Sequence, residues 1–335
     1  MKIDDNFYMK LAIDEAWKYQ LLTYPNPAVG CVVVKNGEIL AIEAHKEAGK
    51  PHAEVNALKT AYLSKYPNDV LKTKSSSHDI HDYLIRNHNN FFEDCTIYVT
   101  LEPCNHIGRT PACANLLKEL KPKRVVIAHE DINKEARGGC ETLKSANIEV
   151  SIDCMKKEAY ELLYPFIKWT QGTFIFYKMA QTLNGSIDGA ISSHIAKAYV
   201  HTLRDKIDLM LIGGNTVRSD KPTLDARYIA GRAPNIMIYS KNKVFDTNIP
   251  LFKVPNREVI ISDDLFKLLD YKFIMVEGTY NLMDKLKEKI DYLVLLVSPK
   301  IRKGVNALND LDIDFKIVHE NYIGEEKIIY LKRKG

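Results

Sequence analysis

The sequence predicts two successive α/β domains. Strands alternate with helices in both halves of the chain, which is typical of layered α/β sheets. At 335 residues the chain is also longer than one hydrophobic core of ordinary size requires. Hydrophobic residues make up 46% and charged residues 27%, the composition of a folded chain. We therefore expect a first domain over residues 1–153, a connecting helix over 154–171 and a second domain over 172–335.

The elements of the first half follow from the spacing of apolar side chains. Residues 3–22 have a helical period, and we expect that helix to end before the prolines of residues 24–27. Two β-rich runs flank Asn36-Gly37, a pair that suits a type I′ turn, so residues 30–45 predict a β-hairpin. The remaining elements are a helix (52–63), a strand (96–104), a helix (110–120), a strand (124–131) and a final helix and strand (139–153).

Residues 64–93 interrupt this alternation. The segment is polar and holds His78, His81 and His88, which have no partnering cysteine or paired carboxylates. We predict a solvated surface insertion with one short helix. A second zinc site is the alternative hypothesis.

The second half repeats the pattern of strands and helices without repeating the sequence of the first. Its C-terminal edge strands are expected to be antiparallel or mixed. The predicted strands are 173–181, 209–214, 235–240, 258–262, 273–278, 292–298, 315–319 and 327–332, with helices at 194–207 and 281–290.

Charge and composition restrict the class of partner. A net charge of +4 is mild and does not demand a nucleic-acid partner, which would need clustered Lys and Arg, but it suits a small phosphorylated substrate. We find no signal peptide and no apolar run long enough for a membrane span, so we expect a cytoplasmic protein without a membrane partner. In that compartment six cysteines indicate metal ligands or reduced core residues rather than disulfides.

Three short motifs together predict a zinc site. His52 and Glu54 open a predicted helix, Cys104 follows a predicted strand, and Cys113 lies where another helix begins. One histidine and two cysteines leave the fourth tetrahedral position of zinc free for water, whereas a structural zinc site normally has four protein ligands. The alternatives are a structural zinc site or two buried core cysteines. The other cysteines are predicted to be core or incidental residues: Cys31, Cys95, Cys140 and Cys154.

The open coordination position predicts hydrolytic chemistry. Zinc lowers the pKa of bound water toward neutrality, so that hydroxide can attack an amidine-like ring carbon. Glu54 is two residues beyond the histidine ligand and can reach that water without binding the metal. We expect it to take the proton of the water and to return protons to the ring nitrogen and the leaving ammonia.

Four segments of the first half carry a resemblance to a known family: YPNPAVGCVVV (24–34), HAEVNAL (52–58), YVTLEPCNHIGRTPAC (98–113) and RVVIAHEDIN (124–133). They resemble those of the bifunctional deaminase–reductase family of riboflavin biosynthesis. The general deaminase signature has two residues between its cysteines, whereas Cys104 and Cys113 enclose eight, NHIGRTPA, which is this family's form of the loop. An RNA-directed deaminase or a zinc-dependent binding protein is a third hypothesis; the eight-residue spacing and the lack of an Arg/Lys-rich stripe argue against it.

The resemblance implies a cytidine-deaminase-like α/β/α sandwich followed by a dihydrofolate-reductase-like α/β domain. The implied first reaction removes the 2-amino group of a diaminopyrimidinone that bears a phosphoribosylamino arm, using one zinc ion per chain. By resemblance, Asn26 and His45 line the base pocket and Arg109 reaches the ribose phosphate. An asparagine can read a pyrimidinone edge, and an arginine can bind phosphate with two hydrogen bonds. The alternatives are that Asn26 is only a turn residue, that His45 is only a structural histidine and that Arg109 only caps the loop.

The second domain is similar to the family's reductase, which reduces the ribosyl arm to ribityl with NADPH. The resemblance is looser here. It implies substrate-binding roles for Lys178, Arg204, Leu224, Arg227 and Glu277. It implies cofactor-binding roles for Ala180, Thr216, Asp220, Ser240, Gly278 and Thr279. The alternative for Arg204 and Arg227 is that they are solvated surface charges. The alternative for Glu277 is a plain residue at the end of a strand.

Two departures from the family pattern leave a second hypothesis open. The loop between Gly185 and Ile191 is shorter than usual beside the nicotinamide, and residues 276–282, VEGTYNL, lack the second glycine and the proline of the phosphate loop. The altered glycine-rich loop at 276–282 can still offer backbone N–H groups to a phosphate at the helix start, from Thr279 onward. The alternative is a deaminase with a degenerate reductase-like domain. The family also commonly forms homo-oligomers, which we list as a possible assembly.

Overall fold

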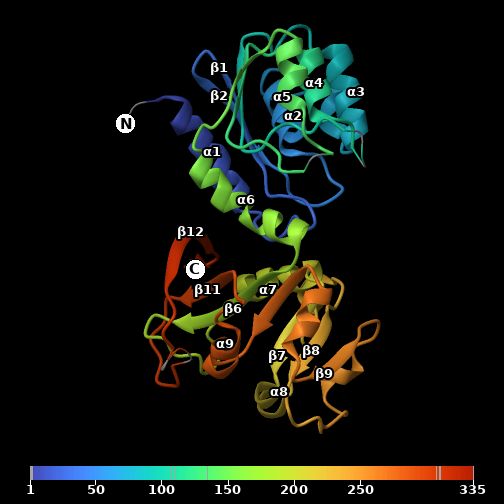
Figure 1. Ribbon diagram of the computed structural model, residues 1–335. Helices are drawn as coiled ribbons and strands as arrows, with labels where there is room; N and C mark the ends of the chain where they lie inside the picture. Colours follow the sequence, from blue (N-terminus) through green and yellow to red (C-terminus); the bar gives the residue numbers. More distant parts are fainter. Residues whose placement is uncertain are drawn as a thin grey trace. The chain divides into compact units, whose positions relative to one another are not determined.

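The computed structural model describes residues 3–106, 108, 110–133, 135–306, 308 and 311–334. The chain divides into two compact units, Met1–Ile167 and Lys168–Gly335, so the division falls inside helix α6 (Lys156–Gln171). Each unit has its own sheet (Figure 1). Among the described residues, no helix is both long and apolar enough to cross a membrane.

The first unit is built on a five-stranded sheet with the order β2-β1-β3-β4-β5. Strand β1 pairs antiparallel with β2 and β3, while β3, β4 and β5 are parallel. The hairpin prediction is confirmed: Asn36 and Gly37 have φ values of 52° and 85°, as a type I′ turn requires. The strands are β1 (Gly30–Lys35), β2 (Glu38–Ala44), β3 (Cys95–Val99), β4 (Arg124–Ile127) and β5 (Glu149–Ser151).

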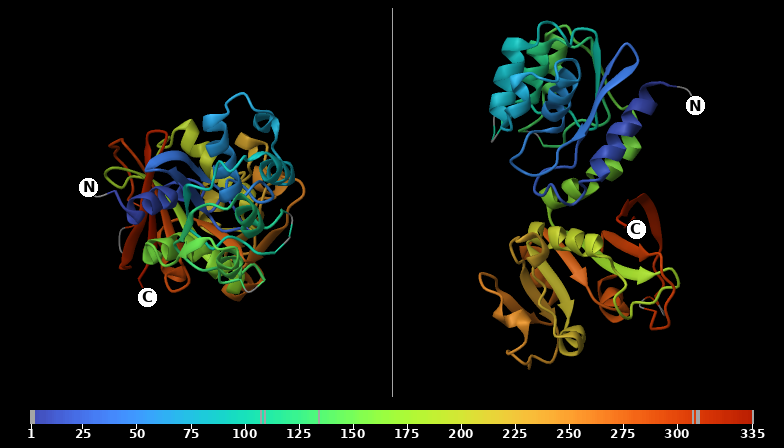
Figure 2. Two further views of the ribbon diagram at one scale, coloured as in Figure 1. Left: turned by 90° about the horizontal axis from the view of Figure 1, so that it is seen from above. Right: turned by 180° about the vertical axis from the view of Figure 1, so that it is seen from behind.

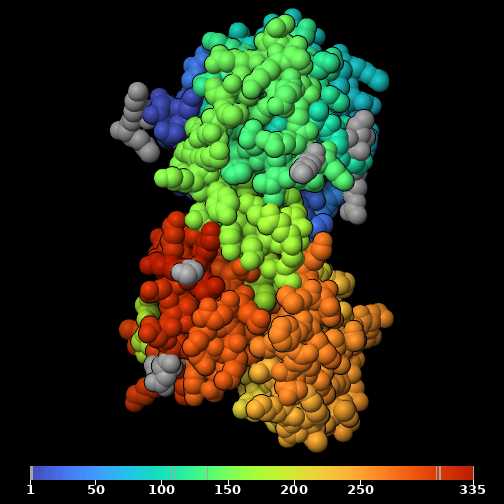
Figure 3. Space-filling view, viewed as in Figure 1, coloured from blue at the N-terminus to red at the C-terminus, as the bar shows by residue number. Residues whose placement is uncertain are grey.

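Helices cover this sheet. Helices α1 and α6 lie side by side in opposite views, and the Gln20 side chain donates a hydrogen bond to the Leu162 carbonyl beside them (Figures 1 and 2). The green residues of α5 and α6 form much of the visible surface of the first unit (Figure 3). The other helices of the unit are α1 (Asp5–Trp17), α2 (Ala53–Lys65), α3 (Ser77–Asn87), α4 (Cys113–Leu120) and α5 (Gly139–Ser145).

Helix α1 is shorter than expected. The predicted helix over residues 3–22 ends at Trp17 and continues as turns. Leu21 is fully buried with a φ of 68°, a left-handed conformation that an α-helix cannot contain. The chain therefore leaves the helical conformation where Leu21 is buried, although the helical spacing of apolar residues continues to this point.

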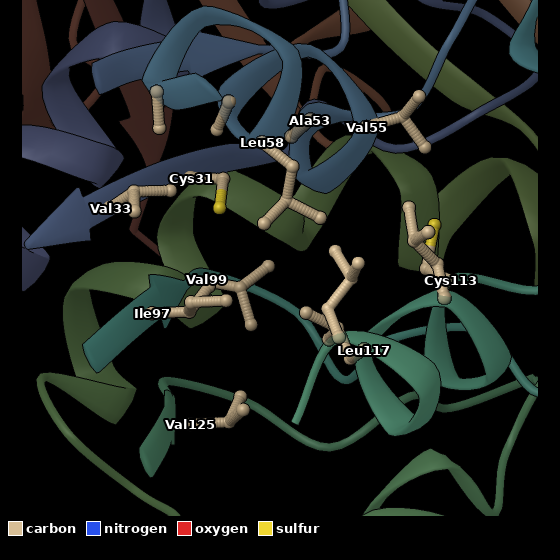
Figure 4. Close-up of a cluster of buried hydrophobic side chains, with 14 of the residues drawn as sticks. Cys31, Val33, Ala53, Val55, Leu58, Ile97, Val99, Cys113, Leu117 and Val125 are labelled. Atoms are coloured by element: carbon tan, nitrogen blue, oxygen red, sulfur yellow. The ribbon is translucent and has the colours of Figure 1, made fainter. Parts of the chain in front are cut away.

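The hydrophobic core fixes the starts of α2 and α4. Cys31 and Val33 of β1 and Val99 of β3 face Leu58 of α2 and Leu117 of α4 (Figure 4). All five side chains are fully buried, and full burial of a Val or Leu side chain contributes about 1.5–3 kcal/mol. The two helices are therefore held rigidly on the sheet, which positions the residues in their first turns.

Residues 64–93 are not a solvated insertion. The segment forms the 3₁₀ helix Val70–Thr73 and the predicted short helix, α3, which packs on α2 and α4. Leu71, Ile80, Leu84 and Phe92 are buried in the core of the first unit. Ile80 and Leu84 are four residues apart, which places both on one helix face. This spacing was not recognised in the sequence because most residues of the segment are polar. Among the described residues, the three histidines of this segment do not form a metal-binding cluster.

A close approach of α1 to β1 leads to a stability prediction. A β-carbon added to Gly30 would lie 1.9 Å from the carbonyl oxygen of Ala12. We expect Gly30→Ala to lower the free energy of unfolding of the first unit by about 3 kcal/mol, because helix and strand must separate. Urea unfolding measures this. Gly172→Ala is the control, since its β-carbon would meet nothing within 4 Å; equal stability of the two variants would contradict the prediction.

The second unit has an eight-stranded sheet with the order β12-β13-β11-β6-β10-β7-β8-β9. Strands β11, β6, β10, β7, β8 and β9 are parallel, and β12 and β13 are antiparallel, which confirms the mixed C-terminal edge. The strands are β6 (Phe174–Thr182), β7 (Leu209–Gly213), β8 (Asn235–Tyr239), β9 (Val259–Ser262), β10 (Phe273–Glu277), β11 (Tyr292–Ser298), β12 (Phe315–Ile323) and β13 (Glu326–Arg333).

The carboxyl ends of the six parallel strands meet at one edge of this sheet. In open α/β sheets ligands bind at that edge. Helices α8 (Gly214–Asp220) and α9 (Tyr280–Leu286) begin there, directly after β7 and shortly after β10. Helix α9 ends four residues before the predicted end of the helix at 281–290. Helix α7 (His194–Lys206) precedes β7.

Candidate active sites

His52, Cys104 and Cys113 form a cluster in the first unit. The Nδ1 atom of His52 lies 3.6 Å from the Cys104 sulfur and 3.4 Å from the Cys113 sulfur. All three ligand atoms lie within 4.8 Å of one another. One imidazole and two thiols in this arrangement fit a tetrahedral zinc ion with one position open.

Local structure explains why these residues meet. His52 is the residue before α2, and Cys113 is the first residue of α4. Cys104 follows β3, and its sulfur accepts a hydrogen bond of 3.4 Å from the Cys113 backbone N–H. The side-chain hydrogen bond from the Cys113 thiol is the largest influence that lowers the pKa of the Cys104 thiol, and His52 lowers it further against the effect of burial. The thiolate is the form that binds a metal.

Glu54 follows the ligand His52 by two residues and is not itself part of the ligand cluster. It is in the first turn of α2 and is 4% exposed. Burial raises its pKa to about 7, although the charge of His52 opposes this shift. A carboxyl group that titrates near neutrality can both accept and release a proton, which general acid–base catalysis requires.

Asn26 and His45 are placed beside this cluster. The Asn26 amide nitrogen lies 3.1 Å from His45 Nε2, and His45 Nδ1 lies 3.1 Å from the Pro51 carbonyl. Because the carbonyl can only accept, Nδ1 carries the proton and Nε2 accepts from Asn26. Burial lowers the pKa of His45 to about 4, so its ring is neutral at pH 7. The rings of His45 and His52 are 5.4 Å apart, whereas Arg109 lies outside the described residues.

Two further residues support the cluster and were missed in the sequence. The Thr110 hydroxyl lies 3.3 Å from His52 Nε2 and can orient the ring while Nδ1 faces the sulfurs. Glu102 is buried and accepts backbone N–H bonds from Asp131, Gly138 and Cys140 at 3.0–3.1 Å. It thereby holds the loop that leads to Cys104. Three of its partners are more than 28 residues away in sequence, so no local pattern could reveal them.

Three predicted residues of the second unit form a charged cluster. Glu277, at the end of β10, lies 3.3 Å from the Lys178 ammonium and 3.2 Å from the Arg204 guanidinium. Burial alone would raise the pKa of Glu277, but the charges of Lys178 and Arg204 outweigh it and lower the pKa to about 2. The cluster arises because β10 pairs with β6, which carries Lys178.

The other predicted substrate residues of the second unit lie in the loop after α8. Leu224 is buried with a φ of 55°, and Arg227 is exposed and pairs with Asp225 at 2.8 Å. Arg257, which the sequence did not single out, donates hydrogen bonds to the carbonyls of Thr223 and Leu224 at 2.8 and 2.6 Å. It holds the left-handed turn in place.

The predicted cofactor residues lie at the carboxyl edge of the parallel sheet, or on β6 close to it. Thr216 and Asp220 are on α8, Ser240 follows β8, and Gly278 and Thr279 follow β10. The Tyr177 hydroxyl donates a 3.0 Å hydrogen bond to the Thr279 carbonyl, which fixes the turn before α9. Ala180 lies on β6, paired with Leu296 of β11.

The charge cluster leads to a second stability prediction. We expect Glu277→Gln to destabilise the second unit by about 3 kcal/mol at pH 7, because Lys178 and Arg204 lose their buried counterion. The lowered pKa means that the wild-type contribution is complete above the unfolded pKa of about 4.3 and is lost as the pH falls toward 2. The stability difference between wild type and variant should therefore shrink from pH 7 to pH 3.

Urea unfolding at the two pH values measures this difference. Glu288→Gln is the matched control, since Glu288 is 78% exposed and pairs with Arg333 at 3.4 Å. A difference that does not depend on pH, or an equally large effect in the control, would contradict the interpretation.

Comparison with known proteins relates both units to one family. The family described as "Cytidine and deoxycytidylate deaminase zinc-binding region" matches residues 2–129, and the "RibD C-terminal domain" matches residues 173–302. The riboflavin biosynthesis protein RibD of Aquifex aeolicus is 33% identical over 99% of both chains. That of Actinobacillus pleuropneumoniae is 32% identical over 93% of this chain and 81% of its own length.

Solved structures agree with these relatives. RibD of Acinetobacter baumannii is 25% identical, covers 99% of both chains and has a TM-score of 0.66. A diaminohydroxyphosphoribosylaminopyrimidine deaminase/5-amino-6-(5-phosphoribosylamino)uracil reductase of Thermotoga maritima is 26% identical over 98% of this chain and 99% of its own, with a TM-score of 0.67. The expected fold class, zinc and NADPH are consistent with these matches. The chain belongs to the RibD family of riboflavin biosynthesis, in which a zinc-binding deaminase domain precedes a reductase domain.

Proposed function

We propose that this chain catalyses two successive steps. The first unit hydrolyses the 2-amino group of 2,5-diamino-6-(5-phosphoribosylamino)pyrimidin-4-one and releases ammonia. The second unit reduces the ribosyl arm of the resulting aminouracil to ribityl with NADPH. The observation that carries the proposal is the His52–Cys104–Cys113 cluster beside the buried carboxyl of Glu54, in one chain with a RibD-type second unit.

In the first step, His52, Cys104 and Cys113 would hold a zinc ion, which would supply water of lowered pKa when bound. Glu54 takes a proton from that water and donates protons to the ring nitrogen and the leaving amino group, so one water is consumed for each ammonia released. The Asn26 amide nitrogen donates one of its two N–H groups to His45, and we assign the Asn26 oxygen to accept from the pyrimidine. We assign Arg109 to the substrate phosphate on the resemblance alone.

In the second step, bound NADPH would supply a hydride to C1′ of the open, imine form of the arm, and the imine nitrogen would take a proton from solvent. Lys178 and Arg204 keep Glu277 ionised, and all three form the polar floor of the substrate site together with the Leu224 turn. The exposed Arg227 guanidinium is assigned to the substrate phosphate.

Cofactor contacts are assigned to the carboxyl edge of the sheet. We propose that backbone N–H groups around Gly278 and Thr279 bind a cofactor phosphate and that Thr216, Asp220, Ser240 and Ala180 contact the rest of the molecule. The Ser240 hydroxyl donates to the Asn242 carbonyl at 2.7 Å and accepts from Arg218, so it is held in place.

A degenerate second unit is the competing proposal. The short loop after Gly185 and the altered segment at 276–282 favour it. Against it stands the cluster of Lys178, Arg204 and Glu277, because burying three charges costs stability and a unit without chemistry gains nothing from keeping them. We therefore favour an active reductase.

Separate assays of the two steps test the proposal. The purified, zinc-loaded chain should release ammonia from the diaminopyrimidinone phosphate without NADPH, and should oxidise NADPH when it is given the deaminated substrate. Ammonia release without NADPH oxidation would support the degenerate second unit. No ammonia release would contradict the first step.

Two finer expectations belong to the same proposal. We propose that the enzyme acts in the cytoplasm, which is supported by free thiols at all six cysteines. We also propose a homo-oligomer, which light scattering of the purified chain would test.

A further inference from the structure

Arg218, near the end of helix α8, carries a fixed positive charge that the two steps above do not use. Its Nη2 atom donates to the Asn242 and Val244 carbonyls at 2.9 and 3.4 Å and to the Ser240 hydroxyl at 3.3 Å. The guanidinium also lies 4.2 Å from the centroid of the Phe245 ring, a cation–π contact. These contacts immobilise a side chain that otherwise has many rotamers.

The remaining donors of this guanidinium are available to a ligand. Among the described residues, Nε and Nη1 of Arg218 have no hydrogen-bond partner, and the side chain forms no ion pair. Neither atom is among the buried side-chain atoms without a partner, whereas the Nε atoms of Arg204 and Arg257 are. Nε and Nη1 of Arg218 are therefore open to solvent, and an anion can reach them.

The neighbouring charges do not balance that of Arg218. Lys243 follows in the same loop but pairs with Asp263 at 2.6 Å, so those two charges cancel. The Asp220 carboxylate accepts from the Ser219 hydroxyl. A half-buried guanidinium without a counterion costs stability, and arginine is well suited to bind phosphate. The arrangement therefore fits a phosphate group that a ligand supplies.

A close approach at the start of α8 forms a small space for this group. Helix α8 packs beside β7 and β8 (Figure 1). A β-carbon added to Gly214, the first residue of α8, would lie 2.6 Å from the Ser240 hydroxyl oxygen and 3.0 Å from Arg218 Nη1. The unpaired Nη1 donor and a hydroxyl assigned to the cofactor thus line one space, which glycine leaves open.

The position of Arg218 on the sheet indicates which phosphate it binds. The proposed cofactor phosphate lies at Gly278 and Thr279, which follow β10, and the substrate cluster around Glu277 lies at the end of the same strand. Strand β8, which Ser240 follows, is two strands away in the order β10-β7-β8, or about 10 Å. An anion near Ser240 then belongs to the adenosine end of the cofactor, where NADPH differs from NADH by its 2′-phosphate.

We propose that Arg218 binds the 2′-phosphate of NADPH and thereby selects NADPH over NADH. The inference rests on the proposed function of the second unit, through its cofactor assignments. Nη2 and the Phe245 ring hold the guanidinium in place, and Nη1 and Nε are the donors that remain for the phosphate. Hydrogen bonds of this kind are charge-assisted and therefore strong.

Calorimetric titration of the zinc-loaded full chain with 2′,5′-ADP and with 5′-AMP tests the proposal, because these nucleotides differ only in the 2′-phosphate. The wild type should bind 2′,5′-ADP more tightly. Arg218→Gln should weaken binding of 2′,5′-ADP about tenfold or more and leave that of 5′-AMP unchanged. The KM for NADPH should rise in the same variant, while the KM for NADH stays the same.

A second variant covers the case in which Arg218→Gln disturbs folding. Phe245→Leu removes the ring face under the guanidinium and should weaken binding of 2′,5′-ADP about threefold, again without effect on 5′-AMP. Lys243→Gln is the matched control, since it removes from the same loop a charge that Asp263 already balances. It should leave both affinities unchanged.

Three results would overturn the inference. Equal weakening of both nucleotides in Arg218→Gln would show that this arginine only holds the loop. Unchanged affinities in both Arg218→Gln and Phe245→Leu would show that the phosphate binds elsewhere. A wild type that does not distinguish the two nucleotides would show that the chain does not read the 2′-phosphate. Selective binding of 2′,5′-ADP without NADPH oxidation would instead overturn the proposed reduction and leave this inference standing.

Discussion

Replacing Glu54 with glutamine is expected to lower the rate of ammonia release by at least about 10³-fold. Glutamine keeps the size of the side chain and fits the same buried position, but it cannot accept the proton of the attacking water. Zinc binding should be unchanged, since Glu54 lies outside the ligand cluster. NADPH-dependent reduction should also be unchanged, because its residues are in the second unit.

Metal analysis and the two separate assays measure these effects. Glu47→Gln serves as the control, as it removes an acidic group from the exposed loop before the same helix. Near-normal ammonia release by Glu54→Gln would show that another group moves the proton.

Replacing Cys104 with serine is expected to have the second large effect. The variant should hold almost no zinc, where the wild type holds about one ion per chain, and ammonia release should fall below about 1% of the wild-type rate. A serine hydroxyl is a poor zinc ligand because it is not ionised at pH 7, whereas the Cys104 thiol has a lowered pKa. Removing zinc from the wild type with a chelator should have the same effect, reversed by added zinc.

Cys154→Ser is the matched control for this substitution. Cys154 is partly buried, and its sulfur contacts the Asn6 side chain at 3.6 Å, a partner that serine can also reach. The control should keep both zinc and ammonia release. Full zinc occupancy in Cys104→Ser would show that the metal is held elsewhere.

The deaminase site was predictable because its residues lie in short motifs at element boundaries. His52 and Cys113 open helices, and the spacing of the cysteines is a property of one loop. Asn36-Gly37 likewise specifies its turn from two adjacent residues. Such features need no knowledge of which strands pair.

The features that the sequence did not reveal depend on long-range contacts. Glu102 binds backbone groups up to 38 residues away. Glu277 meets Lys178 only because β10 inserts beside β6 in the sheet. Residues 64–93 looked solvated because charged and polar residues outnumber the apolar ones that α3 buries on α2 and α4.

One coupled measurement tests the central claim, that a single chain carries both activities. The zinc-loaded chain would be given the diaminopyrimidinone ribosyl phosphate and NADPH, while ammonia and the nicotinamide absorbance are followed together. We predict that ammonia appears first and that NADPH is then consumed in equal amount. Glu54→Gln should lose both signals, and addition of the deaminated substrate to this variant should restore only the NADPH consumption. Ammonia release with no NADPH consumption, even after the deaminated substrate is added, would contradict the claim and leave the chain a deaminase alone.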